Sequence, residues 1–328
     1  MKAPITNYLL ICTTFCILWA ASGCNATLAT EEDAPLSARK SDSLHSGSVG
    51  GLVSTRFRNL QELSEVVQIE FQGDTASEKG SDAVRLVHFS NNKVVVSELE
   101  QGVSEDDFRS ARDDGFWAKL GLACRTPYAL IHRQDIMRVF VLSRRKHDVF
   151  GPGDVAFYDF AELMTQHIRG EDASKLSAED LTEKGFLNTF NHITAQAFVT
   201  TLFSEELADY VADVHERHNM AALISGKFTK SQLENPENNP MDNYVDMINN
   251  EWGQELGKGL KQQFEIDSKT VWTPELLAGY LNEVQAYYTW AFQISFIPFD
   301  ASDEEVIRFA GKLNTVLNEQ MKLVAGAD

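Results

Sequence analysis

Three stretches in the C-terminal half of the chain carry polar side chains where an amphipathic helix would bury apolar ones. In the first, His192 lies within an apolar run from Phe186 to Phe203. The second contains the adjacent pair His215 and Glu216. The third carries a single helical stripe of polar residues and glycines: Asp246, Asn249, Asn250, Gly253 and Gly257. If the three helices pack together, imidazole, carboxyl and carboxamide groups meet in one place.

A metal site is one chemistry that this set of residues could support. Two imidazoles and a carboxylate form a common ligand set for a divalent metal, so His192, His215 and Asp246 could hold one. Glu216 would then act as the base for a metal-bound water. Neither a His-x-x-x-His spacing nor cysteine ligands accompany these residues. The sequence therefore leaves the cofactor unassigned.

Two interpretations need no metal. In the first, His215 is a general base that Asp246 orients, and Asn249 or Asn250 polarises a carbonyl group of the substrate. In the second, the same residues form a hydrogen-bonded polar network that fixes how the helices pack, with no reaction at all. A buried Asp or Asn needs such partners, because an unpaired buried polar group costs a few kcal/mol.

Two glycines on the polar stripe predict a close approach. Glycine costs about 1 kcal/mol relative to alanine inside a helix. Gly253 and Gly257 lie four residues apart and therefore face the same side. We expect another backbone or a ligand to come close to the helix at these two positions.

The order of these residues resembles a bacterial family of helical domains of unknown function. Its pattern is a helix that bears a histidine, then His-Glu, then Asp-x-x-Asn-Asn-x-x-Gly-x-x-x-Gly. The match lies within residues 185–260, and the segment from Asp246 to Gly257 is the specific part. The chain departs from the pattern at Asn191 and at Gln254, the latter where many members have arginine. Members occur in secreted and surface proteins, some of them toxin-like, so the resemblance implies a site and no particular reaction.

Residues 173–328 are predicted to form an all-α domain. Apolar residues recur there at helical spacing, and helix-capping signals separate the segments. Thr273 and Pro274 are a typical N-cap and first helical residue, and Ser302 with Glu305 forms a capping box. These signals delimit helices at residues 186–203, 205–218, 241–264 and 274–297, and another from residue 304 onward.

Residues 52–172 are predicted to form a small α+β domain in front of the helical one. Val67 to Phe71 alternates apolar and polar residues, as a half-buried strand does. A hairpin with its turn at Ser90-Asn91-Asn92 is expected to follow. Further elements are expected as a helix at 104–120, a strand at 137–142, a turn at 151–153 and a short helix at 159–167. The short basic run at 144–146 is interpreted as a solvated hairpin turn as readily as a basic patch.

The first residues indicate export and a lipid anchor. Lys2 precedes an apolar core from Tyr8 to Ala21, which fits a signal peptide over residues 1–23. Ala-Ser-Gly before Cys24 resembles a bacterial lipobox, so we expect Cys24 to be lipidated; an ordinary secretory signal or an uncleaved anchor are the alternatives. Residues 24–51 are rich in Ala, Ser, Thr, Glu and Gly and are expected to form a flexible tether. Asn25 after the cysteine indicates the outer membrane if the bacterium is Gram-negative.

Only Cys124 lies outside the signal peptide and the lipidation site, so no disulfide framework is expected. A lone cysteine in an apolar run is more often a small core residue than a nucleophile, and we expect Cys124 to be one.

Composition excludes several classes of protein. The 328 residues include 48 Asp and Glu against 29 Lys and Arg, for a net charge of −19. Such a field repels nucleic acid, which clustered basic residues would have to bind. No later segment is apolar enough to suggest a polytopic membrane protein, and the few prolines and glycines exclude collagen.

The sequence thus predicts a lipid-anchored protein of the bacterial cell envelope with one of two roles. It is a hydrolase that acts on envelope material through the His/His/Asp cluster, or it is a non-catalytic binding or scaffold protein whose cluster is structural. Its expected contact with the membrane is the lipid anchor, and no protein partner is identified. An enzyme needs the cluster at a solvent-reaching pocket, whereas a scaffold buries it.

Overall fold

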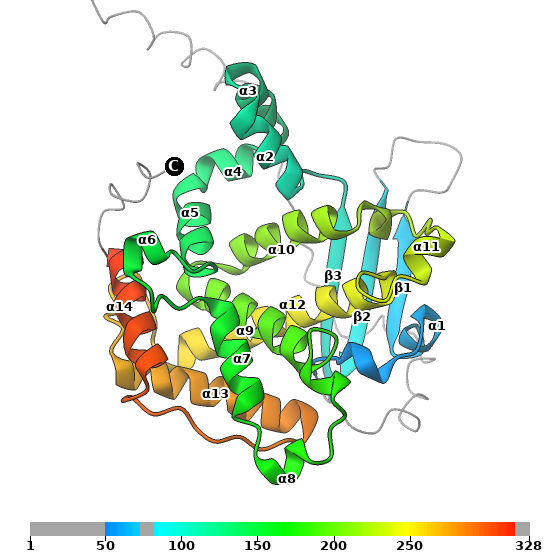
Figure 1. Ribbon diagram of the computed structural model, residues 1–328. Coiled ribbons are helices and arrows are strands. Elements are labelled where there is room, and N and C mark those ends of the chain that lie inside the picture. Colours follow the sequence, from blue (N-terminus) through cyan, green and yellow to red (C-terminus); the bar gives the residue numbers. More distant parts are fainter. Residues whose placement is uncertain (1–49, 73–81, 319–328) are drawn as a thin grey trace, which may run out of the picture. The chain divides into compact units, whose positions relative to one another are not determined.

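The computed structural model describes residues 50–72 and 82–318, all of which belong to one compact unit of the chain. These residues are mostly helical, with one small antiparallel sheet near their N-terminal end (Figure 1). Within the described ranges no helix is long and apolar enough to cross a membrane. The expected signal peptide, Cys24 and most of the expected tether lie outside the described residues.

The sheet has three consecutive antiparallel strands: β1 (Val67–Gln72), β2 (Ala83–Ser90) and β3 (Lys93–Glu100). Asn91 and Asn92 connect β2 to β3 with φ angles of 47° and 61°. Positive φ at both central residues gives a two-residue turn whose twist matches that of the strands. The predicted strand and hairpin are confirmed.

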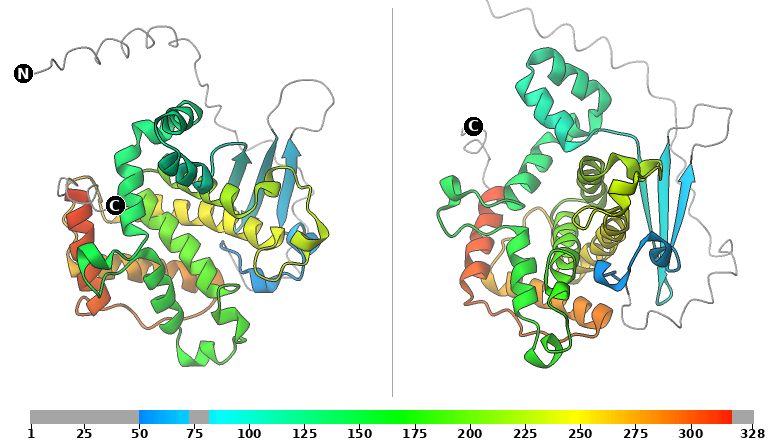
Figure 2. Two further views of the ribbon diagram at one scale, coloured as in Figure 1. Left: turned by 45° about the horizontal axis from the view of Figure 1, so that its top comes forward. Right: turned by 45° about the vertical axis from the view of Figure 1, so that its right-hand side comes forward.

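A helix from much later in the chain covers one face of the sheet. This helix, α12 (Pro240–Gln263), packs on the buried residues of β2 and β3. The shared hydrophobic core includes Val84, Leu86, Val95 and Leu99 of the strands and Tyr244, Ile248 and Trp252 of the helix. The right-hand view of Figure 2 shows the sheet beside α12.

A second hydrophobic core lies among the helices α7 (Phe157–Gln166), α9 (Phe186–Leu202), α13 (Pro274–Phe292) and α14 (Glu304–Asn318). Its centre is a group of aromatic rings, in which Phe198 stacks on Phe157 with ring centroids 5.2 Å apart. Both cores draw residues from either side of position 172. The predicted boundary between residues 172 and 173 therefore runs through both of them.

The remaining helices connect these layers. Those before α7 are η2 (Ser54–Arg56), α1 (Leu60–Leu63), α2 (Glu105–Asp113), α3 (Phe116–Arg125), α4 (Pro127–Ile131), α5 (Arg133–Leu142) and α6 (His147–Phe150). Those after it are α8 (Gly170–Ala173), η3 (Glu179–Leu181), α10 (Glu205–Asn219), η4 (Ala221–Ile224) and α11 (Lys230–Leu233). The helices predicted at 159–167, 186–203, 205–218 and 241–264 are confirmed to within a few residues.

The strand predicted at residues 137–142 is wrong, because these residues belong to helix α5. A short apolar run does not by itself distinguish a buried strand from a buried helix. In α5 the buried side chains are Val139, Val141 and Leu142, and the helix packs against α14. The basic residues that follow lead from α5 to α6, so they do not form the expected hairpin turn.

Four further expectations need correction. The helix predicted at 104–120 is two helices, because Gly115 takes a φ of 87° between α2 and α3. Helix α13 ends before Pro298, with Gln293 in the left-handed conformation. Cys124 is exposed on α3 instead of lying in the core. Gly50 and Gly51, assigned to the tether, are buried in the folded unit.

Candidate functional site

Three neighbouring helices bring five of the polar side chains together. Helices α9, α10 and α12 pack against one another, as Figures 1 and 2 show. The five side chains are Asn188 and His192 from α9, Glu216 from α10, and Asp246 and Asn250 from α12. Residues four apart on a helix share a face, which is why each of the two pairs points into this cluster. We call these five residues the polar network.

Hydrogen bonds connect the network from one helix to the next. His192 Nδ1 lies 2.9 Å from Asn250 Oδ1, and Asn250 Nδ2 donates to Glu216 Oε1 over 3.2 Å. On the other side of the ring, His192 Nε2 lies 3.5 Å from Asp246 Oδ2. Asn188 Nδ2 donates to Asp246 Oδ1 over 2.7 Å. Since the Asn250 oxygen accepts, the His192 proton belongs on Nδ1.

Burial favours the uncharged forms of the ionisable members of the network. It lowers the pKa of His192 to about 4 and raises that of Glu216 to about 7. The pKa of Asp246 is also well above its usual range, because the carboxyl is buried and Asp242 and Glu216 lie nearby. Glu216 is 1% exposed and Asp246 is 6% exposed. The neutral Asp246 carboxyl can therefore donate toward the free Nε2 of the ring.

His215 does not join the network, contrary to prediction. Neighbouring helical residues point about 100° apart, so Glu216 faces α12 whereas its neighbour faces α2. His215 Nδ1 lies 2.9 Å from Glu105 Oε1, and its side chain is 45% exposed. This hydrogen bond raises the pKa of His215 and lowers that of Glu105. The triad of His192, His215 and Asp246 is therefore not assembled.

Asn249 also faces away from the other polar residues of α12. Its Oδ1 accepts from the backbone N–H of Leu52 over 2.8 Å, and its Nδ2 donates to the Leu52 carbonyl over 2.9 Å. Thr189 Oγ1 donates to the same carbonyl. Asn249 therefore fixes the start of the described chain to α12 and is not aimed at a substrate carbonyl.

Gly253 and Gly257 lie where α12 crosses α9. A Cβ atom added to Gly253 would lie 2.7 Å from the carbonyl oxygen of Ile193. One added to Gly257 would lie 2.6 Å from the carbonyl oxygen of Ala197. The neighbour that comes close is thus another helix backbone.

The described parts of the chain contain no group of three or more His, Cys, Asp or Glu side chains that could hold a metal ion. His192 and Asp246 are adjacent, but the second imidazole needed for the predicted ligand set faces Glu105.

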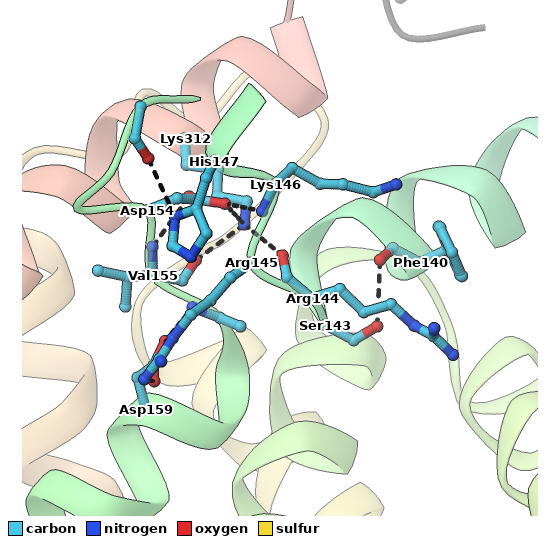
Figure 3. Close-up of polar contacts among 12 residues, drawn as sticks. Phe140, Ser143, Arg144, Arg145, Lys146, His147, Asp154, Val155, Asp159 and Lys312 are labelled. Atoms are coloured by element: carbon cyan, nitrogen blue, oxygen red, sulfur yellow. Dashed lines mark hydrogen bonds and ion pairs between the residues drawn. The ribbon is translucent and has the colours of Figure 1, made fainter. Parts of the chain in front are cut away.

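Sequence reasoning missed a second buried polar centre, which Figure 3 shows. Lys312 Nζ of α14 donates to Asp154 Oδ2 and to the carbonyls of Arg144 and Val155, over 2.8 to 2.9 Å. The two charged side chains are 1% and 2% exposed. Beside them, Arg145 pairs with Asp159. A lysine among Phe309, Leu313 and Val316 on the apolar face of α14 was the available signal.

Comparison of the chain with protein-family models, with curated proteins and with solved structures finds no match. What the polar network does must therefore be inferred from its own geometry and chemistry.

Proposed function

We propose that this chain is a non-catalytic, lipid-anchored protein of the bacterial cell envelope that binds or scaffolds a partner. Its finer organisation in this proposal is an α+β N-terminal part followed by an all-α C-terminal part, and the two parts share both hydrophobic cores. Within the all-α part, the polar network sets the mutual position of α9, α10 and α12.

The burial of the polar network and the hydrogen bonds among its members carry this proposal. Both ring nitrogens of His192 face groups of the network, and Asn250 uses both its oxygen and its amide in contacts with neighbours, whereas Glu216 Oε2 is buried without a hydrogen-bond partner among the described residues. A general base must instead reach a substrate proton, directly or through one water. Buried hydrogen-bonded networks rigidify a core and specify its packing.

The anchor in this proposal rests on the sequence. A basic residue, an apolar segment and Ala-Ser-Gly before Cys24 support lipidation after export. Asn25, directly after the cysteine, supports sorting of the lipoprotein to the outer membrane if the cell is Gram-negative. The net charge of −19 supports a partner other than nucleic acid. The resemblance to a helical family with surface members is in keeping with the same location.

Isosteric variants test whether the network is catalytic. Glu216→Gln and Asp246→Asn keep the size of the side chain but remove its capacity to exchange a proton. A scaffold should tolerate both changes, with a cooperative unfolding transition retained and full complementation of a deletion strain's envelope phenotype. A folded variant that fails to complement would contradict the proposal.

The anchor has its own test. Mass spectrometry of the N-terminal peptide should find a diacylglycerol on Cys24, and Cys24→Ser should abolish this modification. An unmodified Cys24 in protein purified from the membrane fraction would contradict lipid anchoring, and it would leave the result for the isosteric variants unaffected.

A hydrolase is the second candidate function, and one observation favours it. The pKa of Glu216 is about 7, which suits a group that must both accept and donate a proton. Perturbed pKa values of this kind cluster at active sites. In this alternative Glu216 exchanges the proton, His192 and Asp246 orient the site, and Glu216→Gln abolishes activity with the fold intact.

A further inference from the structure

One stretch of this acidic chain has no carboxylate. Between Asp114 and Asp135 there is neither Asp nor Glu, whereas Lys119, Arg125 and Arg133 contribute positive charge. The stretch contains helices α3 and α4. The net charge of this stretch is therefore positive, whereas the net charge of the whole chain is negative.

The same stretch exposes most of its large apolar side chains. On α3, Phe116 is 70% exposed, Trp117 is 78% exposed and Leu120 is 45% exposed. On α4, Leu130 and Ile131 are 62% and 76% exposed. Clustered exposure of this kind marks an interaction surface more often than scattered single residues do. We call these five side chains the apolar tip.

The position of α3 explains why no described part of the chain covers the apolar tip. Helix α3 packs against α2 and α4, and Figure 1 and the right-hand view of Figure 2 draw α2 and α3 at a margin of the unit, away from α9 and α13. Leu122 and Ala123 are half-buried, whereas Phe116 and Leu120 point away from the neighbouring helices.

Ion pairs neutralise much of the acidic helix beside the apolar tip. In α2, Asp106 pairs with Arg109 at 2.8 Å and Asp113 pairs with Arg112 at 3.2 Å. Asp107 pairs with Arg125 of α3 at 2.7 Å. Lys119 and Arg133 have no ion pair among the described residues. Charges further than about 8 Å away are largely screened at physiological salt, so the field at the tip depends on Lys119 and Arg133 against the exposed carboxylate of Asp114 more than on the net charge of the molecule.

We propose that α3 and α4 form a membrane-docking surface that inserts the apolar tip into the interface of a bilayer containing anionic lipids. Aromatic and aliphatic side chains next to basic ones are the composition of interfacial helices, and the tryptophan ring favours the headgroup level. Lys119 and Arg133 would then face lipid phosphates, because basic side chains near an anionic surface are attracted to it.

This inference rests on the proposed function only for bringing the protein to a membrane. A lipid on Cys24 would fix one end of the chain and would not by itself decide which face of the folded unit meets the bilayer. Docking of the tip would hold it against the bilayer in one orientation.

The fluorescence of Trp117 tests the proposal. Purified full-length protein is mixed with phosphatidylcholine vesicles that carry brominated acyl chains, with or without phosphatidylglycerol. The difference between wild type and Trp117→Phe isolates the signal of Trp117. With phosphatidylglycerol present, this signal should shift to shorter wavelength and be quenched by the bromines. Lys119→Glu with Arg133→Glu should weaken the apparent affinity roughly tenfold or more.

A matched control changes the same charge elsewhere. Lys227→Glu with Lys269→Glu replaces two other exposed lysines and should leave the quenching of Trp117 unchanged. Three results would overturn the proposal: no quenching of Trp117 in either vesicle, equal weakening by the control, or a dimer in light scattering that Trp117→Ser dissociates. Absence of lipid on Cys24 would contradict the proposed function only, since added vesicles report on the tip regardless of the anchor.

Discussion

At the residue scale, burial determines the character of the polar network. An imidazole and two carboxyls that all titrate in water lie within hydrogen-bond reach of carboxamides and of one another. Because desolvation penalises the charged forms, the pKa of His192 falls and those of Glu216 and Asp246 rise. Hydrogen bonds between the uncharged forms of these groups therefore hold the network. Its stability depends on the protonation states of His192, Glu216 and Asp246.

Glu216→Gln should remove part of the pH dependence of folding. The pKa of Glu216 rises from 4.5 to about 7 on folding, so the native state holds this proton more tightly than the unfolded state. Its contribution is complete below pH 4.5 and is lost as the pH rises through 7.

Between about pH 5 and pH 8, the free energy of unfolding of the wild type should therefore fall relative to that of the variant, by on the order of 2 kcal/mol. Urea titrations at several pH values measure this difference. Parallel curves for the two proteins would show that Glu216 is ionised in the folded state.

At the element scale, the crossing of α9 and α12 decides how the network forms. The two glycines let the helix backbones approach, and that approach brings Asn188 and His192 to Asp246 and Asn250. Helix α10 adds Glu216 through the amide of Asn250. A change in the distance between α9 and α12 should therefore disturb the polar network before it disturbs the sheet.

Gly257→Ala should destabilise the protein, whereas Gly259→Ala on the same helix should stabilise it. A Cβ at position 257 would lie 2.6 Å from a backbone oxygen, and such overpacking costs about 1–3 kcal/mol. At position 259 no atom lies within 4 Å of the added Cβ, so alanine gains about 0.5–1 kcal/mol of helix propensity. Thermal denaturation should give a lower melting temperature for Gly257→Ala and a higher one for Gly259→Ala. Equal shifts in melting temperature would contradict this account of the helix crossing.

At the scale of the whole described chain, contacts between distant segments hold the helical layers together. Asn249 fixes the backbone of Leu52, near the start of the described chain, to the middle of α12. Lys312 of α14 fixes the connection between α5 and α7 through three hydrogen bonds (Figure 3). These contacts join residues that lie far apart in the sequence, and no sequence pattern predicts that they meet.

Lys312→Ala should cost about 3–5 kcal/mol, because it leaves the buried Asp154 carboxylate without its cation. The exposed pair of Lys258 and Glu205, with side chains 37% and 48% exposed, provides the matched comparison. Lys258→Ala should cost less than about 1 kcal/mol. Chemical denaturation compares the two variants, and a loss below 1 kcal/mol at Lys312 would mean that the pair is dispensable.

The sequence by itself determined the features that depend on spacing within one element. The alternation in β1, the Asn-Asn turn, the N-cap threonine at Thr273 and the stripe from Asp246 to Gly257 are local patterns, and local geometry follows from them. The helix at 137–142 could not be predicted in this way, because its short apolar run fits a strand equally well until α14 packs against it.

Only the tertiary structure decided which polar groups meet. His215 and Glu216 are adjacent in sequence, yet one faces Glu105 of α2 and the other faces Asn250 of α12. Asn249 and Asn250 likewise diverge, toward Leu52 and toward His192. The physical reason is that a side chain's partner depends on which helix lies opposite its face, and that neighbour is set by packing between residues far apart in the chain.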